Sequence, residues 1–250
     1  MSNEGPFWLE IRLIGQETDS GQAYDALYTD GGLSQIESFY LWLMDQLRLP
    51  TSGALLDVSC GAGEVVRLAT QYGLQAIGVD ISEVAAQAAY QNTGSLSLIA
   101  VSAGECLPFP SACFDFVTNI GSLEHFSDPA LGVREMARVL RPGGKAFVLV
   151  PNTFSLLTNV WVAFRTGRTS IDHQPIQRYG ARADWTCLLE SNGLRVCHII
   201  KYERPWPRLA CDWKHYWRRP KELIRLFVAP FIPLNLAFCF LFTCEPGQWG

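Results

Sequence analysis

Ala54-Leu55-Leu56-Asp57-Val58-Ser59-Cys60-Gly61-Ala62-Gly63-Glu64 decides the fold, because an apolar run ends here in an acidic residue and a glycine turn. A helical pattern over 62–72 follows. This order predicts a strand, a tight loop and a helix N-terminus, which together present backbone N–H groups to a ligand. Gly61 and Gly63 allow positive φ and close approach to bare main chain. Ser59 replaces the first glycine of a G-x-G-x-x-G motif, and no Gly-Lys-Ser/Thr follows, so the loop is not a P-loop.

A second apolar run, over 75–80, ends in Asp80. A carboxylate at the tip of the neighbouring strand, about 20 residues past the glycine loop, is placed to accept both hydroxyls of a ribose. The loop and Asp80 together predict a site for a nucleoside-containing cofactor.

Strands and helices alternate between 54 and 150, which predicts a mostly parallel sheet covered by helices on both faces. Ser82 and the pair Asp128-Pro129 are expected to begin two of the helices, and Pro142-Gly143-Gly144 to end one. The expected strands are 54–58, 75–80, 96–101, 114–120 and 144–150, and the expected helices are 62–72, 82–91 and 129–140.

Five ordered motifs resemble those of class I S-adenosylmethionine-dependent methyltransferases, in particular the bacterial group of small-molecule and quinone methylases. They are 55–63, Asp80, Leu107-Pro108-Phe109, Leu123-Glu124-His125 and 138–144. The resemblance covers residues 50 to 152 well and the remainder loosely. It implies S-adenosyl-L-methionine as cofactor and an α/β, doubly wound, Rossmann-like, seven-stranded, mostly parallel sheet. A C-terminal antiparallel hairpin is expected from strands near 194–202 and 235–244. The motifs specify the cofactor and leave the acceptor open.

The chain length fits one domain in three segments. Residues 1–50 are expected to form an N-terminal helical lid with a helix over 34–47, and residues 51–152 the cofactor-binding core. Residues 153–250 are expected to supply an acceptor-side insertion, the closing strands and a basic, aromatic C-terminal segment. The stretch 151–182 is expected to be a long, strand-poor insertion.

The candidate cofactor residues follow from the loop and from the resemblance. The helix N-terminus can face the methionyl carboxylate, and Asp57 and Glu64 can face the ammonium group, with a favourable first-turn acid as the alternative for Glu64. By resemblance Ile81 packs on the adenine, and Ala103 stands where the family usually has an aspartate for the adenine amino group. The full set is Asp57, Ser59, Gly61, Gly63, Asp80, Ile81, Ala103, Gly104, Glu105 and Ile120.

His125, at the carboxyl edge of the sheet, is the candidate general base, with Glu124 beside it. A base is needed only if the acceptor is protonated at the working pH, and a purely structural histidine stays an open alternative. In some relatives a Glu-His pair assists a metal. Gly121 replaces the acidic partner expected upstream, so no metal is predicted.

The candidate acceptor residues are Tyr28, His173, Arg178 and Tyr179. By resemblance Tyr24 and Tyr28 belong to a lid over the cofactor, and simple aromatic packing is the alternative for both. The predicted acceptor is a small molecule or a lipid-like compound, methylated at O, N or C.

Net charge and cysteine usage limit the expected partners and the expected compartment of the protein. The net charge of −4 argues against nucleic acid as the partner. Eight cysteines without a C-x-x-C pair favour free thiols in a reducing compartment. No signal peptide is recognised, so a cytoplasmic location is expected.

Residues 201–225 hold eight Lys/Arg and three Asp/Glu, with tryptophans between them. This composition favours either peripheral membrane contact through 206–229, at the inner face of the membrane, or a cap over the site. The uncharged run 226–244 is interrupted by Pro230 and Pro233, which favours a helix and a strand over a membrane span.

Two rival functions stay open. A nicotinamide-dependent oxidoreductase uses a similar loop and acidic strand end, although its pyrophosphate requires the glycines that Ser59 and the 61–63 spacing do not supply. A cofactor-binding or membrane-associated scaffold without catalysis is the other, because Ala103 replaces the usual aspartate. The oligomeric state and the pathway are not predicted.

Overall fold

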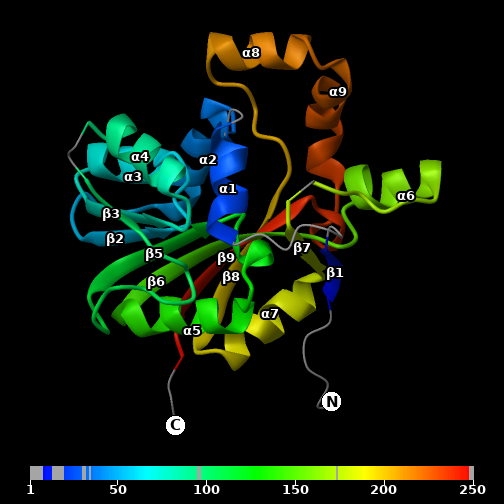
Figure 1. Cartoon of the computed structure of the whole chain (residues 1–250). Helices are drawn as coiled ribbons and strands as arrows, with labels where there is room; N and C mark the ends of the chain where they lie inside the picture. Colours follow the sequence, from blue (N-terminus) through cyan, green and yellow to red (C-terminus); the bar gives the residue numbers. More distant parts are fainter. Residues whose placement is uncertain are drawn as a thin grey trace.

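The computed structural model describes residues 8–12, 20–29, 32–33, 35–94, 97–172 and 174–247. Its main element is a seven-stranded sheet with the order β4-β3-β2-β5-β6-β9-β8 (Figure 1). The strands are β2 (Ala54–Val58), β3 (Gln75–Asp80), β4 (Leu98–Val101), β5 (Phe114–Ile120), β6 (Leu140–Pro151), β8 (Leu194–Tyr202) and β9 (Cys239–Pro246). The first five in the sheet order are parallel, and β9 is antiparallel to both β6 and β8. The predicted seven-stranded, mostly parallel sheet with C-terminal antiparallel strands is confirmed.

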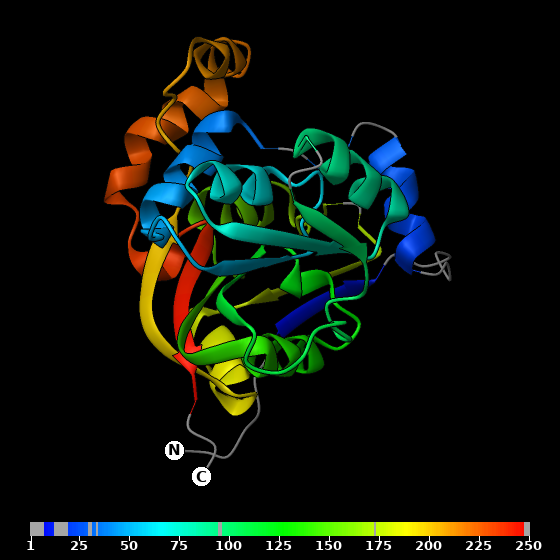
Figure 2. The same cartoon turned by 90° about the vertical axis from the view of Figure 1, so that its left-hand side faces the viewer.

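Helices cover both faces of this sheet (Figure 2). One face carries α2 (Glu37–Leu47), α3 (Glu64–Gln71) and α4 (Glu83–Asn92), and the other carries α5 (Pro129–Val139) and α7 (Arg182–Ser191). Successive side chains of a strand point to opposite faces. Accordingly Leu55 packs in the core under α2 and α3, and its neighbour Leu56 packs in the core under α5 and α7. The doubly wound arrangement is therefore confirmed.

The predicted helix starts are also present. The Ser82 hydroxyl accepts a hydrogen bond from the Ala85 N–H at 3.1 Å, and Asp128 accepts one from the Leu131 N–H at 3.0 Å. Each cap satisfies a backbone donor that has no partner inside its helix. Helix α5 ends at Val139, and β6 begins at Leu140 instead of the predicted 144.

The predicted strand-poor insertion 151–182 contains a strand, and in this respect the prediction was wrong. Strand β7 (Ile176–Gly180) pairs antiparallel with β1 (Trp8–Arg12) in a separate two-stranded sheet. The same insertion contains a π-helical turn, η2 (Leu156–Val160), and helix α6 (Trp161–Thr166). Because the partner of β7 lies at the other end of the chain, local sequence pattern does not report the pairing.

The remaining helices frame the carboxyl edge of the sheet. Helix α1 (Ser20–Thr29) packs on α4, where Asp25 accepts hydrogen bonds from the Ser82 hydroxyl at 2.5 Å and the Val84 N–H at 3.2 Å. The last elements in this layer are η1 (Leu123–His125), α8 (Ala210–Trp217), α9 (Pro220–Val228), η3 (Ala229–Phe231) and η4 (Leu234–Leu236). Among the described residues, every helix is too short or too polar to cross a bilayer.

Candidate functional site

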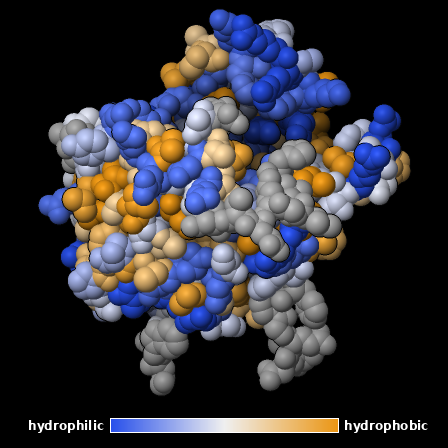
Figure 3. Space-filling model, viewed as in Figure 1, coloured by the Kyte–Doolittle hydropathy of each residue, from blue (hydrophilic) through white to orange (hydrophobic). Residues whose placement is uncertain are grey.

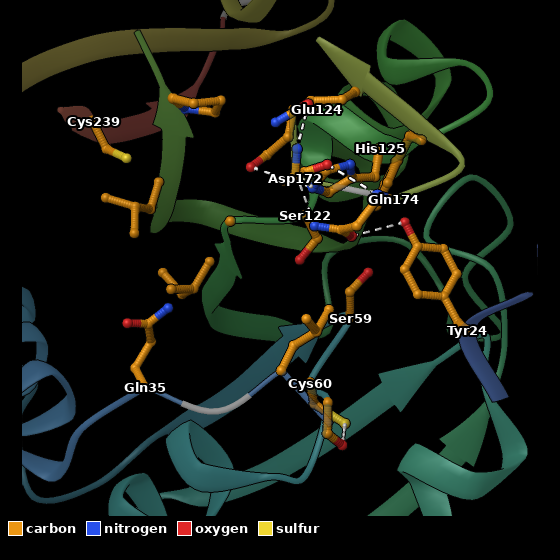
Figure 4. Close-up of a pocket in the computed structure, with 18 of the residues that line it drawn as sticks. Tyr24, Gln35, Ser59, Cys60, Ser122, Glu124, His125, Asp172, Gln174 and Cys239 are labelled. Atoms are coloured by element: carbon orange, nitrogen blue, oxygen red, sulfur yellow. Dashed lines mark hydrogen bonds and ion pairs between the residues drawn. The ribbon is translucent and has the colours of Figure 1, made fainter. Parts of the chain in front are cut away.

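A cavity of about 670 Å³ lies at the carboxyl ends of β2, β3 and β5 (Figure 4). Ligands of open α/β sheets bind at this edge, where neighbouring strands lead to opposite faces. Tyr24 and Tyr28 of α1 line one side of the cavity, and residues of η2 and β7 line another. The N-terminal helix and the 151–182 insertion thus both contribute to the site.

The glycine loop lies in the cavity wall with an unusual backbone. Ser59 has a φ of 61° and Gly61 a φ of 53°. A Cβ atom at Gly61 would lie 2.6 Å from the Tyr28 hydroxyl, so the bare main chain at this point is required for α1 to lie as it does. Ser59, Gly61 and Tyr28 all line the cavity, as the sequence predicts.

Gly63, predicted to face a ligand, has a different role. It is the residue before α3, with a φ of 80°, and a Cβ there would lie 2.8 Å from the Ala89 Cβ on α4. It is absent from the residues that line the cavity. The packing of α3 against α4 therefore explains why residue 63 is a glycine.

Asp80 is held at the tip of β3 by the backbone. One carboxylate oxygen accepts the Gly61 N–H at 2.8 Å, and the other accepts the Ser82 N–H at 3.0 Å. Burial raises the pKa of this carboxyl above its ordinary value, and the backbone hydrogen bonds oppose that shift. Each oxygen keeps acceptor capacity toward the cavity, so Asp80 can accept the two hydroxyls of a ribose.

Asp57 is a second buried carboxyl in the cavity wall, 3% exposed. It accepts a hydrogen bond from the Thr118 hydroxyl at 2.7 Å, and no ion pair to Asp57 is found among the described residues. Burial raises the pKa of this carboxyl to about 7. A buried carboxylate without a cation is costly, so this position favours a ligand that brings a positive charge.

His125 has a defined tautomer because its Nδ1 lies 2.5 Å from the Ile176 carbonyl oxygen of β7. A carbonyl only accepts hydrogen bonds, so Nδ1 carries the proton and Nε2 keeps a free lone pair. Burial lowers the pKa of this imidazole. His125 therefore presents a neutral, unprotonated Nε2 at the cavity, the form that a general base requires.

Two carboxylates lie near Nε2 of His125 at distances too long for direct hydrogen bonds. Glu124 Oε1 is 3.7 Å away and Asp172 Oδ2 is 3.8 Å away. The other oxygen of Glu124 is buried without a hydrogen-bond partner in the described structure, and burial raises the pKa of this carboxyl to about 8. The part of the cavity beside Glu124 and His125 can therefore receive a group that donates hydrogen bonds.

Asp172 was not predicted from the sequence, although it joins the candidate base to the lid. Gln174 donates a side-chain hydrogen bond to Asp172 at 3.1 Å and accepts one from the Tyr24 hydroxyl at 3.2 Å (Figure 4). The sequence feature that marks Asp172 is modest: it is the single acidic residue between 153 and 182.

Arg178, predicted to bind the acceptor, is 2% exposed and does not line the cavity. Its Nε donates to Glu10 of β1 at 2.8 Å, and its other nitrogens donate to the backbone carbonyls of Glu124, Phe126 and Ser127. These contacts join β1, β7 and the loop that carries His125. We therefore assign Arg178 to positioning that loop.

The other predicted residues divide as follows. His173 lies outside the described residues, and Ala103 does not line the cavity. Glu105 does, and it also accepts the Ser127 N–H at 2.8 Å. The predicted residues in the lining are Tyr28, Asp57, Ser59, Gly61, Asp80, Ile81, Gly104, Glu105, Ile120, Glu124, His125 and Tyr179.

Comparison with known proteins agrees with this geometry. Residues 56–148 match the family described as "Methyltransferase domain". The chain is 37% identical over 182 residues to 27-O-demethylrifamycin SV methyltransferase of Amycolatopsis mediterranei, covering 67% of this chain and 65% of that protein. It is 36% identical over 145 residues to demethylmenaquinone methyltransferase of Bacillus licheniformis, covering 56% and 62%. The chain thus spans less than two thirds of the length of these relatives.

A solved structure shares the fold at low sequence identity. The cyclase SpnF superposes with a TM-score of 0.63 at 17% identity, covering 92% of this chain and 96% of that one. Because its printed name denotes a cyclase, the shared fold by itself does not identify the reaction.

Proposed function

Residues 56–148 belong to the class I S-adenosylmethionine-dependent methyltransferases, and we propose that this protein transfers a methyl group from that cofactor to a small, lipid-like acceptor. One observation carries the proposal: Asp57, Asp80 and His125 come from three different strand ends and line one cavity. The first two suit a cationic nucleoside, and the third suits removal of a proton from an acceptor.

The cofactor half of the cavity fits S-adenosylmethionine by charge and shape. Asp57 faces the ammonium group, and the backbone around Gly61 faces the methionyl carboxylate. Asp80 accepts the ribose hydroxyls, and Ile81 packs on the adenine. With Ala103 outside the cavity lining, Gly104 and Glu105 bound the position of the adenine amino group.

When bound, S-adenosylmethionine supplies an electrophilic methyl group. The protein holds the acceptor in line with that group, and such alignment can contribute about 7–11 kcal/mol to lowering the barrier. For a hydroxyl acceptor, His125 Nε2 would take the proton that the acceptor oxygen gives up. Asp172, near Nε2, stabilises the imidazolium that results.

A lipid-like acceptor is supported by the apolar part of the lining. Five apolar or aromatic residues of one hydrophobic cluster line the cavity: Phe39, Tyr40, Leu149, Tyr202 and Phe238. The relatives described above are named for methylation of 27-O-demethylrifamycin SV and of demethylmenaquinone. We propose further that the region 206–229 contacts the inner face of a membrane.

Two measurements, made one after the other, test the proposal. Calorimetry with S-adenosylhomocysteine against NAD tests the cofactor, and tighter binding of NAD would refute the assignment. Transfer of labelled methyl from S-adenosylmethionine into a bacterial lysate, fractionated into lipid, small molecule and protein, then tests the reaction. His125→Asn is the matched inactive variant for a hydroxyl acceptor. Cofactor binding without label in any fraction would favour a non-catalytic scaffold.

A further inference from the structure

Helix α9 exposes an apolar face where a surface helix ordinarily has a polar one. Ile224, Phe227, Val228 and Phe231 are 63%, 61%, 39% and 84% exposed, and their spacing places them on one side of α9 and η3. The inward side is occupied by Leu226, which is 2% exposed. The outward side of this helix is therefore apolar, as its inward side is.

A second apolar projection comes from a distant part of the sequence. Val160, Trp161 and Phe164 of η2 and α6 are 37%, 53% and 80% exposed. The two projections are joined where Arg225 Nη2 of α9 donates a hydrogen bond to the Leu157 carbonyl of η2 at 2.8 Å. In Figure 3 the projection formed by α6 carries both hydrophobic and hydrophilic residues on the face shown. We call these exposed residues of η2, α6, α9 and η3 the α6/α9 surface.

Exposed charge around the α6/α9 surface is positive. The acidic residues between 203 and 238 are buried or partly buried: Asp212 is 3% exposed, and Glu222 lies near Arg204, His215 and Arg219. No acidic residue occurs between 153 and 171. The exposed cations of these segments are Arg165, Arg168, Lys214, Arg218, Arg219 and Lys221, and a seventh, Arg208, pairs with Asp45 of α2 at 2.6 Å.

Tryptophans lie between these cations and the apolar face. Trp206 packs edge-on against Phe227 with ring centroids 5.5 Å apart, and Trp217 is 71% exposed. Exposed tryptophan beside arginine and lysine suits the headgroup level of a bilayer, where the ring is apolar and its N–H stays hydrated.

We propose that the α6/α9 surface docks on an anionic lipid bilayer, with the aromatic side chains of α6, α9 and η3 at the boundary between headgroups and acyl chains. Charge complementarity selects this occupant, since the exposed cations of these segments outnumber their exposed acidic partners and attract anionic lipid. The surface extends beyond 206–229, because α6 belongs to a different part of the chain.

Docking there brings the bilayer to the wall of the cavity. Ser155, Thr158 and Asn159 of the turn that precedes α6 line the cavity, and so do Phe238 and Cys239, which follow η4. Of the two docking segments, the η2 turn therefore also borders the cavity, whereas the described residues of α9 and η3 do not line it. This step rests on the proposed function, whereas the docking itself does not depend on catalysis.

Vesicle co-sedimentation of the full chain tests the docking. The probes are mixed phosphatidylcholine–phosphatidylglycerol vesicles, with pure phosphatidylcholine vesicles as the neutral comparison. We expect binding to the mixed vesicles and an affinity lower by at least about tenfold for Arg218→Glu/Arg219→Glu. Arg134→Glu, an exposed arginine on α5, is the matched control and should bind as the unmodified protein does. Equal losses in both variants would overturn the charge argument.

A second pair of variants tests the contribution of the exposed aromatic side chains to docking. Phe164→Ser/Phe231→Ser removes two exposed side chains and should weaken vesicle binding by at least about tenfold. Tyr90→Ser removes an exposed aromatic from α4 and should not. Absence of sedimentation at low salt, or a dimer that Phe231→Ser dissociates without any vesicle binding, would overturn the proposal. Calorimetry with S-adenosylhomocysteine on the same samples reports separately on the proposed function.

Discussion

The charge state of Asp57 should control the affinity for the cofactor. Its carboxyl is buried, its pKa is raised to about 7, and it lies where the ammonium group of the ligand is expected. A protonated carboxyl is neutral and offers no attraction to a cation. Binding should therefore require the ionised form, and affinity should fall as the pH is lowered through 7.

The size of the effect follows from the titration alone. If only ionised protein binds, the apparent dissociation constant rises about tenfold between about pH 8 and about pH 6, which is about 1.4 kcal/mol. Asp57→Asn keeps the size of the side chain and cannot ionise, so its affinity should be lower at high pH and independent of the Asp57 titration. The difference between the two proteins should shrink as the pH falls.

Isothermal calorimetry with S-adenosylhomocysteine across this range measures both proteins. Asp45→Asn, at an exposed carboxylate of α2, is the matched control and should keep the pH dependence of the unmodified protein. Repeating the titration in buffers of different ionisation enthalpy reports the proton that Asp57 releases on binding. The same pH slope in the unmodified protein and in Asp57→Asn would refute the reasoning.

Three further outcomes are expected. Gly63→Ala should lower the free energy of unfolding by about 2–4 kcal/mol, because residue 63 has positive φ and lies close to α4. The control Gly94→Ala, where φ is positive but the space is open, should lose about 1–2 kcal/mol. Equal losses in denaturant titrations would contradict the packing role of Gly63. Because burial raises the pKa of Glu124 from 4.5 to about 8, ligand-free stability should fall as the pH rises between those values, and Glu124→Gln should flatten that slope in thermal melts. Asp172→Asn should lower the pKa of His125, measured by NMR titration of the ring, and an unchanged value would remove Asp172 from the site.

The cofactor half of the site could be predicted from the sequence because its parts are local. The loop at 59–61 follows directly from a strand whose bounds, 54–58, match the prediction, and Asp80 ends a strand that also matches. Parallel strands bring their carboxyl ends to one edge, so sequence order translates directly into position there. The helix starts at Ser82 and Asp128 were predictable for the same reason, since a cap is made within four residues.

Gly63 shows the limit of that local reasoning. A glycine in a loop has positive φ for several reasons, and the sequence distinguishes neither a bound ligand nor a neighbouring helix as the cause. Here the neighbour is Ala89, some 26 positions along the chain, and the contact depends on how α3 and α4 pack. The sequence predicted the backbone conformation of Gly63 and did not predict its contact with α4.

The acceptor half could not be predicted because it is assembled from distant segments. His125 acquires its tautomer from the Ile176 carbonyl, and β7 is held in place by β1, whose partner residues are more than 150 positions away. Arg178 looked like a ligand-binding cation by composition, yet its guanidinium satisfies four backbone and side-chain acceptors. A buried arginine with four of its five N–H donors used in this way stabilises the assembly, and it does not line the cavity.

This division has a consequence for specificity. The residues that would hold the cofactor lie at the ends of main-sheet strands and on the loops after them, whereas part of the acceptor wall lies on η2, β7 and the segment after α9. Changes in the second group alter the acceptor wall without disturbing Asp57 or Asp80, because the two groups share no hydrogen bond in the described structure. The base connects them, since His125 is placed by a main-sheet loop and oriented by β7. A protein built this way can change its acceptor through the insertion and keep its chemistry through the sheet.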